Sequence, residues 1–272
     1  MGGVTTQSLV AFGGVLVAAA VALKSGVITV SPRAVLAAVP WTVAAVLAVV
    51  ASRDGTYVGY WLWAPLTTAP TPETVLATVV GFAIVAWLGA AYLAALRDIT
   101  VDERYLAASG LAATVVLAAA YLGGVGEAAA IRLLWIPLAA LCTALLAGVG
   151  YVLLGFAYTD ALVELGGAGL FVVGAVGFEA VASAFAVEVL GGAPGFASGL
   201  LLAALATNTG ATTAVIWPVV LSIVVLAGVA FTGVCGRLAR ERRPLGCAIA
   251  LLGSASALGS GLLVLLSAAT LG

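Results

Sequence analysis

The chain has 272 residues, of which 64% are hydrophobic and only 8% are charged, and its mean hydropathy is +1.27. A water-soluble domain of this length needs far more polar surface, so the composition predicts an integral membrane protein whose first partner is the lipid bilayer. The formal net charge of −1 offers no basic surface, so we expect no binding of nucleic acid.

Apolar segments follow one another along the whole chain. A helix needs about 20 predominantly apolar residues to cross roughly 30 Å of hydrocarbon. Eight segments meet this requirement, at 7–24, 33–51, 73–96, 104–122, 129–157, 161–189, 211–236 and 244–271. Because strand alternation is absent, we expect an all-α polytopic bundle that forms a single transmembrane domain over residues 1–272. Prolines inside three of these spans should kink them: Pro40, Pro137 and Pro218.

The basic residues orient the predicted spans. With eight spans, one side of the membrane receives Lys24, Arg33, Arg97, Arg104, Arg237, Arg240, Arg242 and Arg243. The other side receives only Arg53 and Arg132. Since Lys and Arg concentrate on the cytoplasmic side, this distribution predicts a multi-pass protein of the cell membrane with both termini on the outer side.

Two of the segments predicted to lie on the outer side are longer than simple turns and have a distinctive composition. The segment 54–72 contains four closely spaced aromatic residues, namely Tyr57, Tyr60, Trp61 and Trp63. Such side chains favour the headgroup level, so we expect interfacial aromatics here, with a recognition surface as the alternative. The segment 190–210 includes an apolar stretch too short to cross the bilayer, which predicts a short re-entrant or interfacial helix.

Glu179 is the candidate functional residue of greatest interest, because it falls deep within the predicted span 161–189. A carboxylate at such depth costs a few kcal/mol unless it is neutralised, paired or exposed to water. Contact with an ion or a substrate would explain it. A structural hydrogen bond within the bundle, or contact with a partner subunit, is the explanation that we favour. Ser183 is the nearest polar residue of the same predicted helix.

Two further charged residues form a candidate contact near the outer surface. Glu188 lies close to the end of the same span, and Arg132 lies at the outer start of the predicted span 129–157. An ion pair between them is a reasonable expectation, although Glu127 could pair with the same arginine. Asp160 and Glu164 begin the span 161–189, and we interpret them as residues that stabilise its N-terminus.

The residue types present argue against catalysis and against metal binding. The chain contains no histidine, which removes the commonest metal ligand and the usual general base. The three cysteines, Cys142, Cys235 and Cys247, have no CxxC spacing, and we interpret them as buried small hydrophobes. We therefore expect a protein that is not an enzyme and that has no metal and no cofactor.

Several stretches carry a resemblance to a known family. They are TVSPRAVLAAVPWTVAA at 29–45, GFEAVASAFAVEVLG at 177–191, VIWPVVLSIVV at 215–225 and ALGSGLL at 257–263. In order and spacing they resemble the patterned regions of an archaeal multi-spanning membrane family known only as domain of unknown function number sixty-three. The resemblance implies a helical membrane fold and covers most of the chain from about residue 29 onward.

The departures from that family's pattern concern its polar residues. Phe178 stands where the family has histidine, Val181 where it has aspartate, and Ala184 where it has threonine; Glu188 keeps an acidic position. Ser222 or a neighbour replaces a lysine, and Gly259-Ser260-Gly261 replaces a Gly-Pro-Gly followed by polar residues. The resemblance therefore implies a divergent member that has lost the polar centre.

Two functions are compatible with the sequence. The favoured one is a non-catalytic structural or accessory subunit that packs against another membrane protein or against a second copy of itself. The alternative is a transporter or channel for a small or lipid-like substrate, with Glu179 as the coupling or binding group. A transporter predicts a polar cavity around Glu179, whereas an accessory subunit predicts a hydrogen-bonded Glu179 in a closed bundle or at an interface.

Overall fold

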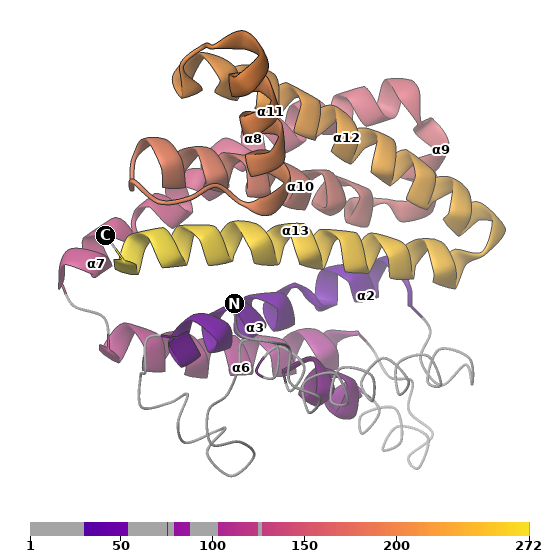
Figure 1. The fold of residues 1–272 in the computed structure, drawn as a ribbon. Helices are drawn as coiled ribbons and strands as arrows, with labels where there is room; N and C mark the ends of the chain where they lie inside the picture. The colour runs from indigo at the N-terminus through magenta and orange to yellow at the C-terminus, as the bar shows by residue number, and fades with distance from the viewer. Residues whose placement is uncertain (1–29, 54–74, 76–78, 88–102, 125–126, 272) are drawn as a thin grey trace, which may run out of the picture. The chain divides into compact units, whose positions relative to one another are not determined.

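The structure is a computed structural model that describes residues 30–53, 75, 79–87, 103–124 and 127–271 (Figure 1). The chain forms two compact units, residues 1–124 and 125–272, and each is described by itself. Within the described residues all regular secondary structure is helical, as the sequence predicts. Six described helices are long and apolar enough to cross a membrane, which makes this a multi-pass membrane protein: Pro32–Ala51, Arg104–Gly123, Trp135–Ala157, Gly167–Glu188, Thr213–Glu241 and Arg243–Thr270.

These six helices overlap six of the eight predicted spans. The predicted span 7–24 lies outside the described residues. Of the predicted span 73–96, residues 75 and 79–87 are described, and they are helical. The total of eight spans, the single domain and the outer position of both termini remain predictions.

The first unit contains α2 (Pro32–Ala37), α3 (Val39–Arg53) and α6 (Arg104–Gly124), with both α2 and α3 packed against α6. The predicted span 33–51 therefore corresponds to α2 and α3, which are separated by the single residue Ala38. The chain breaks at Ala38, shortly before Pro40, whose ring and missing N–H disfavour a continuous helix. Ser31 caps α2 by accepting a hydrogen bond from the Ala34 N–H at 3.1 Å.

Hydrogen bonds fix this break against α6. The Trp41 Nε1 donates to the Leu106 carbonyl at 3.1 Å, and the Thr114 hydroxyl donates to the Pro40 carbonyl at 2.6 Å. Gly110 permits the close approach, since a Cβ there would lie 2.6 Å from Trp41 Cδ1. These two hydrogen bonds join the region around the break to α6.

The second unit contains the remaining labelled helices. They are α7 (Glu127–Arg132), α8 (Trp135–Ala157), α9 (Thr159–Leu165), α10 (Gly167–Glu188), α11 (Phe196–Thr209), α12 (Thr213–Glu241) and α13 (Arg243–Leu271). Two predicted spans are wrong in detail. The span 129–157 is interrupted at Leu133 and Leu134 before α8 begins. The span 161–189 is divided at Gly166, whose φ of +53° ends α9 and separates it from α10.

Helix α10 is the central helix of the second unit. It packs against α8, α12 and α13 (Figure 1). More than half of its residues are buried. Phe178, Val181 and Ala182 of α10 form a core cluster with Ala139 of α8 and Leu265 of α13. Glu179 therefore lies on the helix that is most fully surrounded by protein in this unit.

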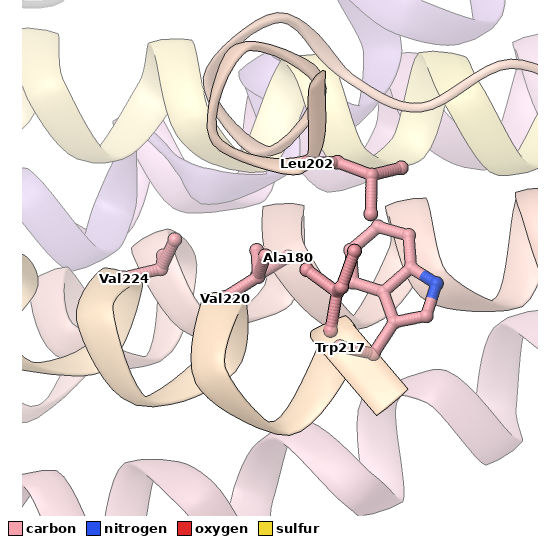
Figure 2. Close-up of a cluster of buried hydrophobic side chains, with 6 residues drawn as sticks. Ala180, Leu202, Trp217, Val220 and Val224 are labelled. Carbon is pink, nitrogen blue, oxygen red and sulfur yellow. The ribbon is translucent and has the colours of Figure 1, made fainter. Parts of the chain in front are cut away.

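The short helix α11 lies between α10 and α12 in the chain and packs against both. Figure 2 shows Leu202 of α11 above the ring of Trp217, with Ala180 of α10 and Val220 of α12 beside it; all four belong to one buried cluster. At about 1.5 Å per residue, α11 is roughly 21 Å long, which is too short to cross the hydrocarbon. This confirms the predicted short apolar helix within 190–210.

Candidate functional site

Glu179 faces the N-terminus of α11 and is only 4% exposed. The Ser198 hydroxyl donates a hydrogen bond to Glu179 Oε2 at 2.6 Å, and the Ser198 backbone N–H donates to Oε1 at 3.4 Å. Ser198 is itself fully buried. The carboxylate is thus enclosed by protein groups, and both of its oxygens accept hydrogen bonds from one residue of α11.

Ser183 holds the segment that leads into α11. Its hydroxyl donates to the backbone carbonyl of Glu179 at 2.8 Å and accepts from the Gly195 N–H at 2.8 Å. Ser183 is one helical turn beyond Glu179, so both side chains point to the same side of α10. Together, Glu179, Ser183, Gly195 and Ser198 form what we call the capping site.

The capping site performs the task that an N-cap side chain usually performs. The first N–H groups of a helix have no partner within that helix, and Ser, Thr, Asp or Asn commonly satisfies one of them. Gly195 occupies the N-cap position of α11 and has no side chain to do this. Glu179 supplies the missing acceptor from a different helix. A negative charge there is also favoured by the partial positive charge of the helix N-terminus.

Two glycines allow the helices to approach this closely. A Cβ at Gly195 would overlap Glu179 Oε1 and would lie 2.9 Å from Ser183 Oγ. A Cβ at Gly261 of α13 would lie 2.8 Å from Phe178 Cδ1 and 3.1 Å from Glu179 Cα. The carboxylate is therefore covered on one side by the backbone of Gly195, while α13 packs tightly against α10 behind it.

The structure does not bring Glu188 and Arg132 together as an ion pair. Glu188 is the last residue of α10, is exposed, and accepts a hydrogen bond from Trp217 Nε1 at 3.0 Å. Arg132 lies in the last turn of the short helix α7. Trp217 was not among the predicted site residues. A tryptophan near a membrane surface normally needs a partner for its N–H, and this is the signal that could have identified the contact.

The remaining predicted positions are distributed elsewhere. Asp160 lies in the first turn of α9, but it forms an ion pair with Arg240 at 2.8 Å; Glu164 lies near the end of α9, so neither residue caps the start of α10. Cys235 and Cys247 are buried, Cys142 is partly buried, and all three thiols are free. The predicted interfacial aromatics Tyr57, Tyr60, Trp61 and Trp63 lie outside the described residues.

Chemically, the capping site is suited to holding a helix in place. Its polar atoms are used by one another, and its four residues come from α10 and from the start of α11. Two cavities of the second unit lie around Tyr158, and Glu179 lines neither of them.

Comparison with known proteins adds no assignment: no family model matches the chain, and neither curated proteins nor solved structures match it. The resemblance to the archaeal family remains a prediction from the sequence stretches that carry it.

Proposed function

We propose that this chain is a non-catalytic subunit of a cell-membrane complex, with a structural or accessory role, which packs against another membrane protein or a second copy of itself. The observation that supports this proposal most strongly is the use of Glu179 within the fold. A carboxylate that couples transport must exchange an ion or contact a substrate, but this one is buried and caps α11. The capping role accounts for Glu179 without any ligand.

The outward face of α8 supports an association with another helix. Ala140, Ala144 and Gly148 recur every four residues on α8, and all three are exposed. A Cβ added at Gly148 would have no neighbour within 4 Å. Small residues at this spacing let a second transmembrane helix approach closely, and van der Waals packing then favours the pair. Leu141 and Leu145, exposed by 60% and 70%, lie on the same helix and would add contact area.

The proposal is tested by the mass of the particle in lipid nanodiscs formed directly from native membranes. We expect the tagged wild-type chain to be recovered with a stoichiometric membrane partner or as a homo-oligomer. Gly148→Leu should release the monomer, because the leucine would occupy the space of the partner helix. Gly123→Leu is the matched control, since Gly123 of α6 is also exposed with no neighbour within 4 Å of an added Cβ.

A wild-type chain that is monomeric in these nanodiscs would contradict the proposal. The transporter alternative has its own test, proton flux into proteoliposomes followed with an internal pH dye under an imposed membrane potential. We expect no flux above that of empty vesicles and an unchanged particle mass for Glu179→Gln. Flux that appears in the wild type and disappears in Glu179→Gln would favour the transporter instead.

A further inference from the structure

Two adjoining cavities lie where α8 ends and α9 begins, and they share Ala157 and Tyr158. The first has a volume of about 240 Å³ and is polar; we call it the arginine pocket. Its other lining residues include Thr159, Asp160, Gly233 and Arg237. The second has a volume of about 430 Å³ and is apolar; we call it the apolar groove. Its other lining residues include Leu153, Phe156, Leu226, Val229 and Ala230.

The arginine pocket contains a cation whose charge has no carboxylate partner. Arg237 is exposed, and its guanidinium lies 5.5 Å from the centroid of the Tyr158 ring. The one carboxylate that lines the pocket, Asp160, is already paired with Arg240 at 2.8 Å. Among the described residues Arg237 forms no ion pair. Its N–H groups are therefore free to bind an anion, and a guanidinium matches phosphate oxygens particularly well.

Charge at this end of the unit also favours an anion. Four arginines lie at the end of α12 and the start of α13, namely Arg237, Arg240, Arg242 and Arg243. The carboxylates of the same region are Asp160, Glu164 and Glu241. Positive charge is therefore in excess. The distribution of basic residues predicts that this end is cytoplasmic, where bilayers commonly carry anionic lipids.

Tyr158 forms the boundary between the pocket and the groove. Its ring lies flat against α12 at Gly233, where a Cβ would be only 2.7 Å from the ring carbons. The Arg237 guanidinium lies over this ring, and the same tyrosine lines the apolar groove together with apolar side chains of α8 and α12. A tyrosine at such a position is typical of the level at which headgroups meet hydrocarbon.

The apolar groove belongs to the part of the molecule that faces lipid. Its residues lie on two helices that are long and apolar enough to cross the membrane, α8 and α12. Phe156 is 86% exposed and Leu226 is 56% exposed, so the groove opens outward instead of into the bundle. A hydrocarbon chain is the ligand that such a groove would take from its surroundings.

We propose that the two cavities together bind one anionic glycerophospholipid, with its phosphate against Arg237 and one acyl chain along the groove between α8 and α12. The site presents a cation, then an aromatic ring, then an apolar groove. The lipid presents a phosphate, then a glycerol backbone, then an acyl chain, in the same order. A free phosphate ion would use the pocket and leave the groove empty. A zwitterionic lipid would occupy the groove but would interact less favourably with the Arg237 guanidinium.

The test is native mass spectrometry of the full-length protein released from nanodiscs that contain equal amounts of phosphatidylglycerol and phosphatidylcholine. We expect the wild type to retain phosphatidylglycerol preferentially. Arg237→Gln should lower this preference about tenfold, because it removes a charge-assisted hydrogen bond to the phosphate. Arg242→Gln is the matched control, an exposed arginine of the same end that does not line the pocket, and should change the preference less than about twofold.

A second pair of variants tests the groove. Ala230→Trp should fill the groove and abolish retention of phosphatidylglycerol, whereas Ala227→Trp, on an exposed position of α12 outside the groove lining, should not. Equal retention by Arg237→Gln and Arg242→Gln would overturn the proposal in favour of general surface charge. Displacement of the lipid by millimolar inorganic phosphate, with Ala230→Trp silent, would overturn it in favour of a free-anion site.

Discussion

The carboxylate of Glu179 is enclosed by Ser183, Gly195 and Ser198 where α11 follows α10, whereas the guanidinium of Arg237 lies open beside Tyr158 where α8 ends and α9 begins. Both are charged groups in an apolar unit. The carboxylate is satisfied by the protein's own backbone and hydroxyl groups, while the guanidinium has an aromatic ring beside it and no ion pair among the described residues. The comparison shows that the role of a charged residue in a membrane protein must be judged from the groups that contact it. A charge whose partners come from the fold needs no ligand to account for it, whereas an exposed charge without a carboxylate partner is open to one.

Removal of the carboxylate should have the largest effect on stability. Glu179→Ala leaves the buried Ser198 hydroxyl and the N-terminus of α11 without their acceptor, so we expect a loss of about 2–3 kcal/mol in the free energy of unfolding. Glu188→Ala, on the same helix, removes the part-buried hydrogen bond from the Trp217 N–H to an exposed carboxylate and should cost about 1 kcal/mol. Chemical unfolding in bicelles measures both. Equal losses would contradict the contrast between an enclosed and an exposed carboxylate.

A methyl group at Gly195 should have an intermediate effect. Gly195→Ala would place its Cβ against Glu179 Oε1 and so displace the carboxylate or the start of α11, at a cost of about 1–2 kcal/mol. Gly177→Ala is the control, because an added Cβ there has no neighbour within 4 Å and alanine is the better helix former by about 1 kcal/mol. We expect unfolding measurements to give opposite signs for the two variants. A neutral result for Gly195→Ala would mean that the capping site adapts.

The smallest effect is expected at the exposed ion pair. Arg240→Gln breaks the contact with Asp160, but the two side chains are exposed by 66% and 70%, so the pair should contribute less than about 0.5 kcal/mol. The loss should vanish at high salt, because screening already weakens the pair. Unfolding curves at low and high ionic strength would reveal this. A salt-independent loss above that size would show that Asp160 serves the pocket in another way.

The sequence predicted those parts of the fold that depend on composition. Long apolar segments with few charges identify transmembrane helices because the bilayer demands them, and the described helices overlap the predicted spans. The short helix within 190–210 was predicted for the same reason. The break at Gly166 was not predicted, since Gly166 and Gly167 stood among many glycines, and only the backbone conformation distinguishes a break from a packing position.

The partners within the candidate site could not be predicted, because they depend on tertiary contacts. Glu179 was identified from its depth alone, but its partner Ser198 lies beyond a turn at the third position of another helix. The usual rules for helix starts would place Ser198 at the N-cap itself. Glu188 was likewise assigned a basic partner, because a carboxylate is expected to pair with a positively charged side chain. In the structure it accepts a hydrogen bond from the Trp217 N–H instead.

The borrowed cap of α11 has a consequence for biosynthesis. A ribosome delivers the chain from its N-terminus, so α10, with Glu179 and Ser183, is complete before α11 is made. Trp217, which covers Leu202 of α11, is synthesised only afterwards. Helix α11 is too short to be inserted as an independent span, and its cap comes from the preceding helix. Helix α11 can therefore dock only after α10 has formed. Its apolar side is covered by Trp217 only after α12 has been synthesised.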